Sequence, residues 1–133
     1  MDQKMLHHAL TEKIIGVFYD VYNELGHGFL ESIYETAMVI ALREKGLVVE
    51  QQVEVPVWFR GNKIGNFFAD LFVEGVVIVE LKAVRSIDPS HEAQLLHYLR
   101  STQIELGLLL NFGVRPEIKR KIFDNPRKSV RSV

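Results

Sequence analysis

Two adjoining apolar segments in the middle of the chain carry charges that their surroundings do not explain. Residues 67–73 and 76–84 are rich in aromatic and β-branched residues and are separated by a Glu-Gly step, which predicts the two strands of a β-hairpin. Such strands belong in a core, where a charge is costly to desolvate unless it is paired or bound to a metal. Asp70, Glu80 and Lys82 are therefore candidates for a functional site.

The register of this hairpin decides whether the three charged side chains can meet. A three-residue loop over residues 73–75, with its glycine in a left-handed conformation, would place all three charges on one face of the sheet. Asp70 and Glu80 would then be diagonal neighbours, about 7 Å apart at the backbone. A two-residue loop would instead turn Asp70 to the opposite face. A shared site for the three charges therefore depends on the three-residue loop.

Apolar residues recur at helical spacing in three other segments. Residues 12–25 are preceded by Thr11, a suitable N-cap, and are followed by Gly26. Residues 30–45 end at Gly46, a residue that commonly follows a helix. The third follows an Asp-Pro-Ser sequence at residues 88–90, which is typical of a helix start. These signals predict helices over residues 12–25, 30–45 and 90–102.

Three further segments have the apolar pattern of strands and complete an α/β fold. Pro56 marks the first as an edge strand or a strand with a bulge, and a turn at residues 60–63 pairs it with the strand of Asp70. The helix predicted before residues 106–112 favours parallel pairing of the strand at those residues. We expect a mixed sheet, made of a three-stranded antiparallel meander plus a parallel strand and flanked by helices. The further strands cover residues 48–59, 106–112 and 118–123.

Composition favours a single domain over residues 1–133 with a sizeable core. The 133 residues are 47% apolar and 25% charged, with a net charge of -1. The absence of cysteine excludes disulfides and thiolate metal sites. The sequence shows no signal peptide and no run of about 18 apolar residues, so we expect a cytoplasmic protein that does not enter membranes.

The near-neutral total charge hides a basic C-terminal tail. Seven of the 16 Lys and Arg residues lie within residues 115–133, which hold only two of the 17 Asp and Glu residues. Electrostatic attraction to nucleic acid would therefore fall on this tail. We expect its phosphate contacts to come from Arg115, Lys119, Arg120 and Lys121.

Five sequence motifs occur in a fixed order along the chain: Gly28-x-x-Glu31-x-x-Tyr34, the lone Asp70, Glu80-Leu81-Lys82, Gln94-x-x-x-Tyr98 and Leu110-Asn111-Phe112-Gly113. This order resembles the small bacterial and archaeal GxxExxY proteins. That family is similar in turn to the PD-(D/E)XK nuclease superfamily, and the Gln-x-x-x-Tyr helix looks like that of its RecB-type branch. The resemblance covers about residues 10–123, with Ala69 in place of the proline that names the superfamily.

The resemblance implies a restriction-endonuclease-like core and a role for each acid. Asp70 and Glu80 would hold Mg²⁺ or Mn²⁺, and Glu31 would reach the metal as a further acid from its helix. Lys82 would orient or activate the attacking water. Hard oxygen ligands suit Mg²⁺, which is typically held by one or two carboxylates plus substrate phosphate. The implied activity is metal-dependent hydrolysis of nucleic acid, with DNA favoured over RNA.

The same residues also have structural explanations. Asp70, Glu80 and Lys82 could form an ordinary cross-strand ion pair, worth roughly 0.2 to 1 kcal/mol. Gln94 and Tyr98, four residues apart on one helical face, would support the site or the nucleic-acid strand according to the resemblance. Taken alone, these two fit a polar helix edge.

Two function classes therefore remain open. The first is a metal-dependent nuclease. The second is a catalytically idle relative that binds nucleic acid or a protein partner as an accessory module. The acids together with Lys82 favour the nuclease, since binding alone does not need a lysine beside the acids. A chain this small offers little surface for gripping a duplex, so a homodimer or a protein partner is a further expectation.

Overall fold

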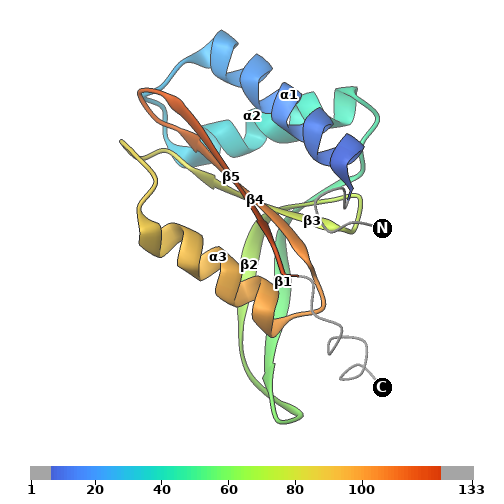
Figure 1. Ribbon diagram of the computed structural model, residues 1–133. Coiled ribbons are helices and arrows are strands. Elements are labelled where there is room, and N and C mark those ends of the chain that lie inside the picture. Colours follow the sequence, from blue (N-terminus) through green and yellow to red (C-terminus); the bar gives the residue numbers. More distant parts are fainter. Residues whose placement is uncertain (1–6, 124–133) are drawn as a thin grey trace.

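The computed structural model describes residues 7–123 as a mixed sheet with helices on both faces (Figure 1). The helices α1 and α2 cover one face of the sheet, and α3 covers the other. No helix in this described range is long and apolar enough to span a membrane. In chain order the elements are α1 (His8–Leu25), α2 (Glu31–Glu44), β1 (Val49–Phe59), β2 (Asn62–Val73), β3 (Val77–Lys82), α3 (Pro89–Ser101), β4 (Leu106–Phe112) and β5 (Pro116–Ile122).

The five strands lie in the sheet in the order in which they occur in the chain. β1, β2 and β3 form an antiparallel meander, β3 and β4 pair in parallel, and β5 pairs antiparallel with β4. The parallel pair follows from the crossover through α3, because a connecting helix returns the chain in the same direction. The predicted fold class is confirmed, and β1 is the edge strand that Pro56 indicated.

Two apolar clusters hold the layers together, one on each face of the sheet. The larger packs the apolar sides of α1 and α2, including Phe18, Tyr34 and Met38, against the sheet. The smaller packs Leu95 and Leu99 of α3 against the opposite face. The central strands β3 and β4 are covered on both faces, which explains why their sequences are apolar almost without interruption.

The strand β2 changes its packing layer at Asp70. Leu71 belongs to the cluster under α1 and α2, whereas Ala69, two positions earlier, belongs to the cluster under α3. The regular pairing with β1 is interrupted at the same level, where Gln52 of β1 has a φ of 48°. Asp70 therefore lies at an irregular point of the sheet, where its side chain is not committed to either core.

The β2–β3 hairpin has a three-residue loop, but the loop begins one residue later than expected. The strands pair so that residues 74–76 form the loop, and Gly75 has the left-handed conformation with a φ of 67°. If this register is continued toward the site, Asp70 lies directly opposite Glu80. The prediction that these two residues are diagonal neighbours is therefore wrong. The residue that faces Asp70 lies two positions further along β3 than predicted, and a shift of two positions keeps side chains on the same face. Asp70, Glu80 and Lys82 therefore share one face and line the same pocket.

The helix ends lie within one residue of the predicted ones, except at the start of α1. α1 begins at His8, so Thr11 is a buried residue inside the helix and not its N-cap. The Thr11 hydroxyl donates to the carbonyl of His8 over 3.0 Å. The helix extends further because Leu10 continues the apolar stripe and packs on the larger cluster.

Candidate active site

The acids and the lysine of the predicted site line one pocket of about 190 Å³. The strands β2 and β3 supply its charged side chains, while α2 and α3 approach from two sides. Residues that are distant in the sequence thus converge as the predicted site requires. The lining residues are Glu31 of α2, Phe68 and Asp70 of β2, Glu80 and Lys82 of β3, Leu109 of β4, and His91, Gln94, Leu95 and Tyr98 of α3.

Asp70 is held by the backbone of the neighbouring strand. Its Oδ2 accepts a hydrogen bond of 2.8 Å from the backbone N–H of Leu81, and its own backbone N–H donates to Oε2 of Glu80 over 3.3 Å. These side-chain bonds replace the regular ladder, because the β2–β3 pairing extends only to Leu71 and Val79. The two strands therefore stop pairing at the site, and the carboxyl groups take the place of the missing backbone partners.

Glu80 has a strongly perturbed pKa. Burial, the charge of Asp70 and a hydrogen bond with the Asp70 carboxyl group raise the pKa of Glu80 to about 9. The nearby charge of Lys82 opposes this shift without cancelling it, so Glu80 keeps its proton at neutral pH. The pair is therefore a site where a divalent cation would replace a proton.

Glu31 is brought to the pocket by a turn that Gly28 and Tyr34 hold in place. Gly28 has a φ of 110°, which residues with a side chain rarely adopt. The buried Tyr34 hydroxyl donates to the carbonyl of Gly26 over 2.6 Å and accepts from the N–H of Phe29 over 3.2 Å. Burial raises the pKa of Glu31, and the negative charge of Asp70 raises it further. The spacing Gly-x-x-Glu-x-x-Tyr thus has a physical basis, since the glycine and the tyrosine shape the turn that presents the acid.

Lys82 lies in the pocket and forms no ion pair with any carboxylate of residues 7–123. It follows Glu80 by two positions on β3, so both side chains project from the same face. This result counts against the explanation of the charges as a cross-strand ion pair. The chain after Lys82 is braced by Asn111, whose Oδ1 accepts from the N–H of Val84 over 3.0 Å and whose Nδ2 donates to Glu117 over 3.0 Å.

A capping box fixes the start of α3 and so sets the direction of Gln94 and Tyr98. Nδ1 of His91 accepts from the backbone N–H of Asp88 over 3.1 Å, and the N–H of His91 donates to the carbonyl of Asp88 over 2.8 Å. Further along the helix, Nε2 of Gln94 donates to the Tyr98 hydroxyl over 2.6 Å. The Tyr98 ring stacks on Phe67 of β2, with ring centroids 3.5 Å apart. Burial raises the pKa of Tyr98, and the charge of Glu80 raises it further, so the Tyr98 hydroxyl keeps its proton at neutral pH.

The donor set fits a hard divalent cation that keeps several of its waters. Asp70 and Glu80 offer carboxylate oxygens, and Mg²⁺ is typically bound by one or two carboxylates plus substrate phosphate. Within residues 7–123, no three His, Asp or Glu side chains form a ready-made cage for a metal ion. Asp70 and Glu80 would be the ligands of such a cation, and their metal contacts, like that of Glu31, stay predictions.

The basic residues of the predicted tail do not share one surface. Lys119 and Lys121 project from β5 toward the α3 side of the sheet. There Nζ of Lys121 forms an ion pair of 2.8 Å with Glu92 of α3. Arg120 lies between them in the strand and projects to the α1 side, and Arg115 is exposed in the loop before β5. Of these four, only Lys119 and Lys121 lie on the α3 side of the sheet. Residues 124–133 of the predicted tail lie outside the described residues.

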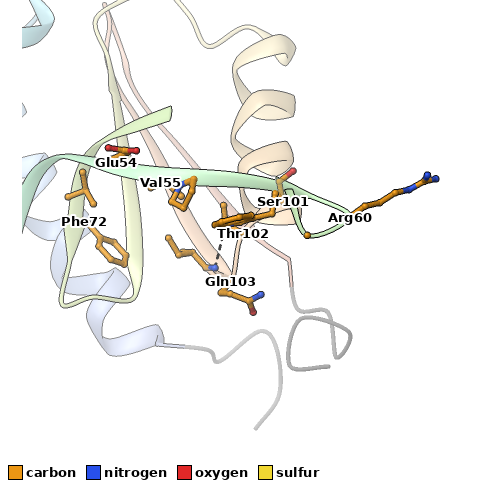
Figure 2. Close-up of a pocket in the computed structure, with 12 residues that line it drawn as sticks. Glu54, Val55, Arg60, Phe72, Ser101, Thr102 and Gln103 are labelled. Carbon is orange, nitrogen blue, oxygen red and sulfur yellow. Dashed lines mark hydrogen bonds between the residues drawn. The ribbon is translucent and has the colours of Figure 1, made fainter. Parts of the chain in front are cut away.

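A larger hollow of about 740 Å³ (Figure 2) shares no lining residue with the pocket of Asp70 and Glu80. It opens between β1 and the segment that follows α3, and its lining includes Val55, Phe72 and Thr102. The labelled Arg60 points away from it. No predicted site residue belongs to its lining. This hollow is larger than the pocket of Asp70, but its lining lacks Asp70, Glu80 and Lys82, the side chains that could act on a substrate. The smaller pocket is therefore the candidate active site.

Three polar residues support the site although no role was predicted for them. Gln52 donates to Asp70 through its side-chain amide over 3.2 Å, and Asn111 with Glu117 braces the chain after β3. An isolated polar residue in a strand is usually exposed, so the alternation of polar and apolar positions gave Gln52 no special weight. Asn111 did carry a usable signal, because an amide within an otherwise apolar buried strand must find hydrogen-bond partners.

Comparison with known proteins identifies the family of this chain. The crystal structure of SSO0001 is similar to it over 74% of this chain and 52% of that chain, with a TM-score of 0.52 and 19% sequence identity. The chain thus spans about half the length of that protein, and the likeness supports the restriction-endonuclease-like fold alone. No curated protein matches the sequence significantly. A family model described as the PD-(D/E)XK nuclease superfamily matches residues 8–121, and the protein therefore belongs to that superfamily.

Proposed function

We propose that the protein is a nuclease that hydrolyses phosphodiester bonds of DNA, in preference to RNA, with the help of Mg²⁺ or Mn²⁺. The observation that carries the proposal is the convergence of Asp70, Glu80 and Lys82 in one pocket. Membership of the superfamily supports nuclease activity in general. The five motifs further support assignment to the GxxExxY proteins and the RecB-type branch, from which the preference for DNA is taken.

Each charged side chain has a role that follows from its place in the pocket. A cation held by Asp70 and Glu80 would polarise the phosphodiester and make water a stronger nucleophile at neutral pH. Glu80 would release its proton to solvent on binding the cation, because ligating carboxylates are ionised. Lys82 orients the attacking water through a hydrogen bond from Nζ and stabilises the negative charge that develops on the phosphate. Glu31 adds a carboxylate on the α2 side.

The substrate strand is placed along the α3 side of the sheet. The Tyr98 hydroxyl accepts from Gln94 and keeps its own proton, so it can donate to a phosphate oxygen. Lys119 and Lys121 of β5 provide positive charge on the same side of the sheet. A second copy of the chain or a protein partner would supply the remaining grip on a duplex, because the domain itself is small.

A substrate panel tests this function. The purified protein is incubated with labelled single- and double-stranded DNA and RNA in Mg²⁺, in Mn²⁺ or in EDTA. Cleavage of DNA that EDTA abolishes is the expected result. Binding without cleavage of any of these substrates in either metal would assign the chain to the class of catalytically idle accessory modules.

A further inference from the structure

Gln52 of β1 links the candidate metal ligand Asp70 to the helix α2. Its Nε2 donates to Oδ1 of Asp70 over 3.2 Å and to Oε1 of Glu35 over 3.0 Å. The adjacent Gln51 donates to the other oxygen of Glu35 over 3.0 Å. Glu35 lies one turn after Glu31, so the two strand amides tie down the face of α2 that carries this further acid of the pocket.

The orientation of the Gln52 amide follows from its partners. Both of its neighbours, Asp70 and Glu35, are carboxylates, which only accept hydrogen bonds when they are ionised. The amide must therefore present its NH₂ group and not its oxygen. One N–H group goes to each carboxylate, so a neutral side chain bridges two acids that would otherwise repel each other.

The backbone of Gln52 adopts an unusual conformation that makes this bridge. Its φ is 48°, in the left-handed region that few residues other than Gly, Asn and Asp enter. In the described part of the chain, the other non-glycine residues with positive φ are His7, Arg60 and Glu74, which lie in turns or at a helix start. Gln52 is the one inside a strand, at the level where the pairing of β1 with β2 is interrupted. The conformation breaks the ladder beside Asp70 and brings the amide to its carboxylate.

We propose that Gln52 is a positioning residue that orients Asp70 for metal binding, an inference that rests on the proposed function. The N–H of Leu81 fixes Oδ2 of Asp70, and Gln52 fixes Oδ1. Each carboxylate oxygen has two lone pairs, so both remain able to bind a cation while the carboxylate plane is held. Hydrogen-bond partners of metal ligands typically contribute about 10- to 100-fold to metal affinity. Loss of the Gln52 amide should weaken metal binding by about this factor.

The test compares Mn²⁺ affinity, measured by titration calorimetry on the full chain, in two variants and a matched control. Gln52→Gly removes the amide and relieves the left-handed backbone. Gln52→Asn suits the same backbone but has an amide one methylene too short to reach both acids. Arg60→Gly relieves a φ of 49° in the β1–β2 turn, outside the lining of the acid pocket. We expect both Gln52 variants to stay folded without metal and to bind Mn²⁺ roughly 10- to 100-fold more weakly, with Arg60→Gly unchanged.

The outcomes separate this inference from the proposed function. If the wild-type protein binds Mn²⁺ and either folded Gln52 variant binds it within twofold of the wild type, the positioning role is wrong and the nuclease proposal stands. An equal loss in Arg60→Gly would likewise overturn the role, because it would trace the effect to the backbone of β1. If the wild type neither binds Mn²⁺ nor cleaves nucleic acid, the proposed function fails and the inference fails with it.

Discussion

Asp70 and Glu80 face each other across the β2–β3 pair, and the backbone N–H of Asp70 donates to Oε2 of Glu80 over 3.3 Å. The N–H of Leu81 donates back to Oδ2 of Asp70 over 2.8 Å. The strands hold the two carboxyl groups together through their backbones, although the two groups repel each other when both are ionised. A cation between the two carboxyl groups would relieve this repulsion, and the pKa of Glu80 is raised in its absence.

Stability should depend on pH through Glu80. Its pKa is raised to about 9, so the folded protein holds a proton that the unfolded chain loses near the ordinary pKa of 4.5. The stability that Glu80 contributes is thus complete below about pH 4.5 and is lost as the pH rises toward 9. Glu80→Gln, which is neutral throughout, should be more stable than the wild type by roughly 1–3 kcal/mol at pH 8, and equally stable at pH 4. Urea unfolding in EDTA at both pH values measures this difference.

Glu54 provides the control of opposite sign. Hydrogen bonds from Asn66 and Lys63 lower the pKa of this exposed carboxylate. Glu54→Gln should therefore lose a little stability at neutral pH, and the loss should vanish as the pH falls. A Glu80→Gln variant that is no more stable than the wild type at pH 8 would contradict the raised pKa of Glu80.

Much of this architecture could be predicted from the pattern of apolar residues, because that pattern decides which residues share a face. The loop of the β2–β3 hairpin begins one residue later than predicted, yet Asp70 and Glu80 remain on one face, since the partner moves by two positions. The exact pairing could not be predicted, because a shift of two positions leaves every apolar side chain in the core. Gln52 could not be predicted for another reason: its role depends on a single left-handed residue in β1.

Lys82→Met should separate metal binding from hydrolysis. The variant keeps much of the length of the side chain and removes the positive charge beside the acids, so Mn²⁺ affinity should be retained or increased. The cleavage rate at saturating metal should fall by about 10²- to 10³-fold, the usual contribution of a donor that stabilises charge developing in the transition state. Calorimetry and a single-turnover assay on the same preparation measure the two effects. A rate within a few-fold of the wild type would remove Lys82 from the reaction.

Gly113 should tolerate no side chain, because the chain that follows β3 passes very close to it. A Cβ atom at Gly113 would lie 2.6 Å from the carbonyl oxygen of Val84, two residues after Lys82. Gly113→Ala should cost roughly 1–3 kcal/mol in urea unfolding, and it should also slow cleavage by moving the end of β3. Gly65→Ala is the matched control, since a Cβ there meets nothing within 4 Å. Equal effects of the two substitutions would contradict the close packing at Gly113.

Binding of nucleic acid should depend on the two lysines of β5 that face the α3 side. Replacing Lys119 and Lys121 with glutamine should reduce the slope of log affinity against log salt by about 0.7 to 0.9 for each phosphate that the variant no longer neutralises. Fluorescence anisotropy in EDTA measures the slope without cleavage. Lys13→Gln combined with Lys45→Gln makes the same charge change on exposed positions of the α1 and α2 side. A slope reduced equally by both pairs would place the binding surface elsewhere.

Single-turnover cleavage of DNA by the wild-type protein and by Asp70→Asn, purified side by side and assayed in Mg²⁺ and in Mn²⁺, is the decisive comparison for the pocket. Asp70→Asn keeps the size of the side chain and removes the negative charge that would hold a cation between β2 and β3. We expect metal-dependent cleavage by the wild type and a decrease of at least about 10²-fold in the variant. Equal cleavage by the two proteins would contradict a reaction at the pocket formed by Asp70, Glu80 and Lys82.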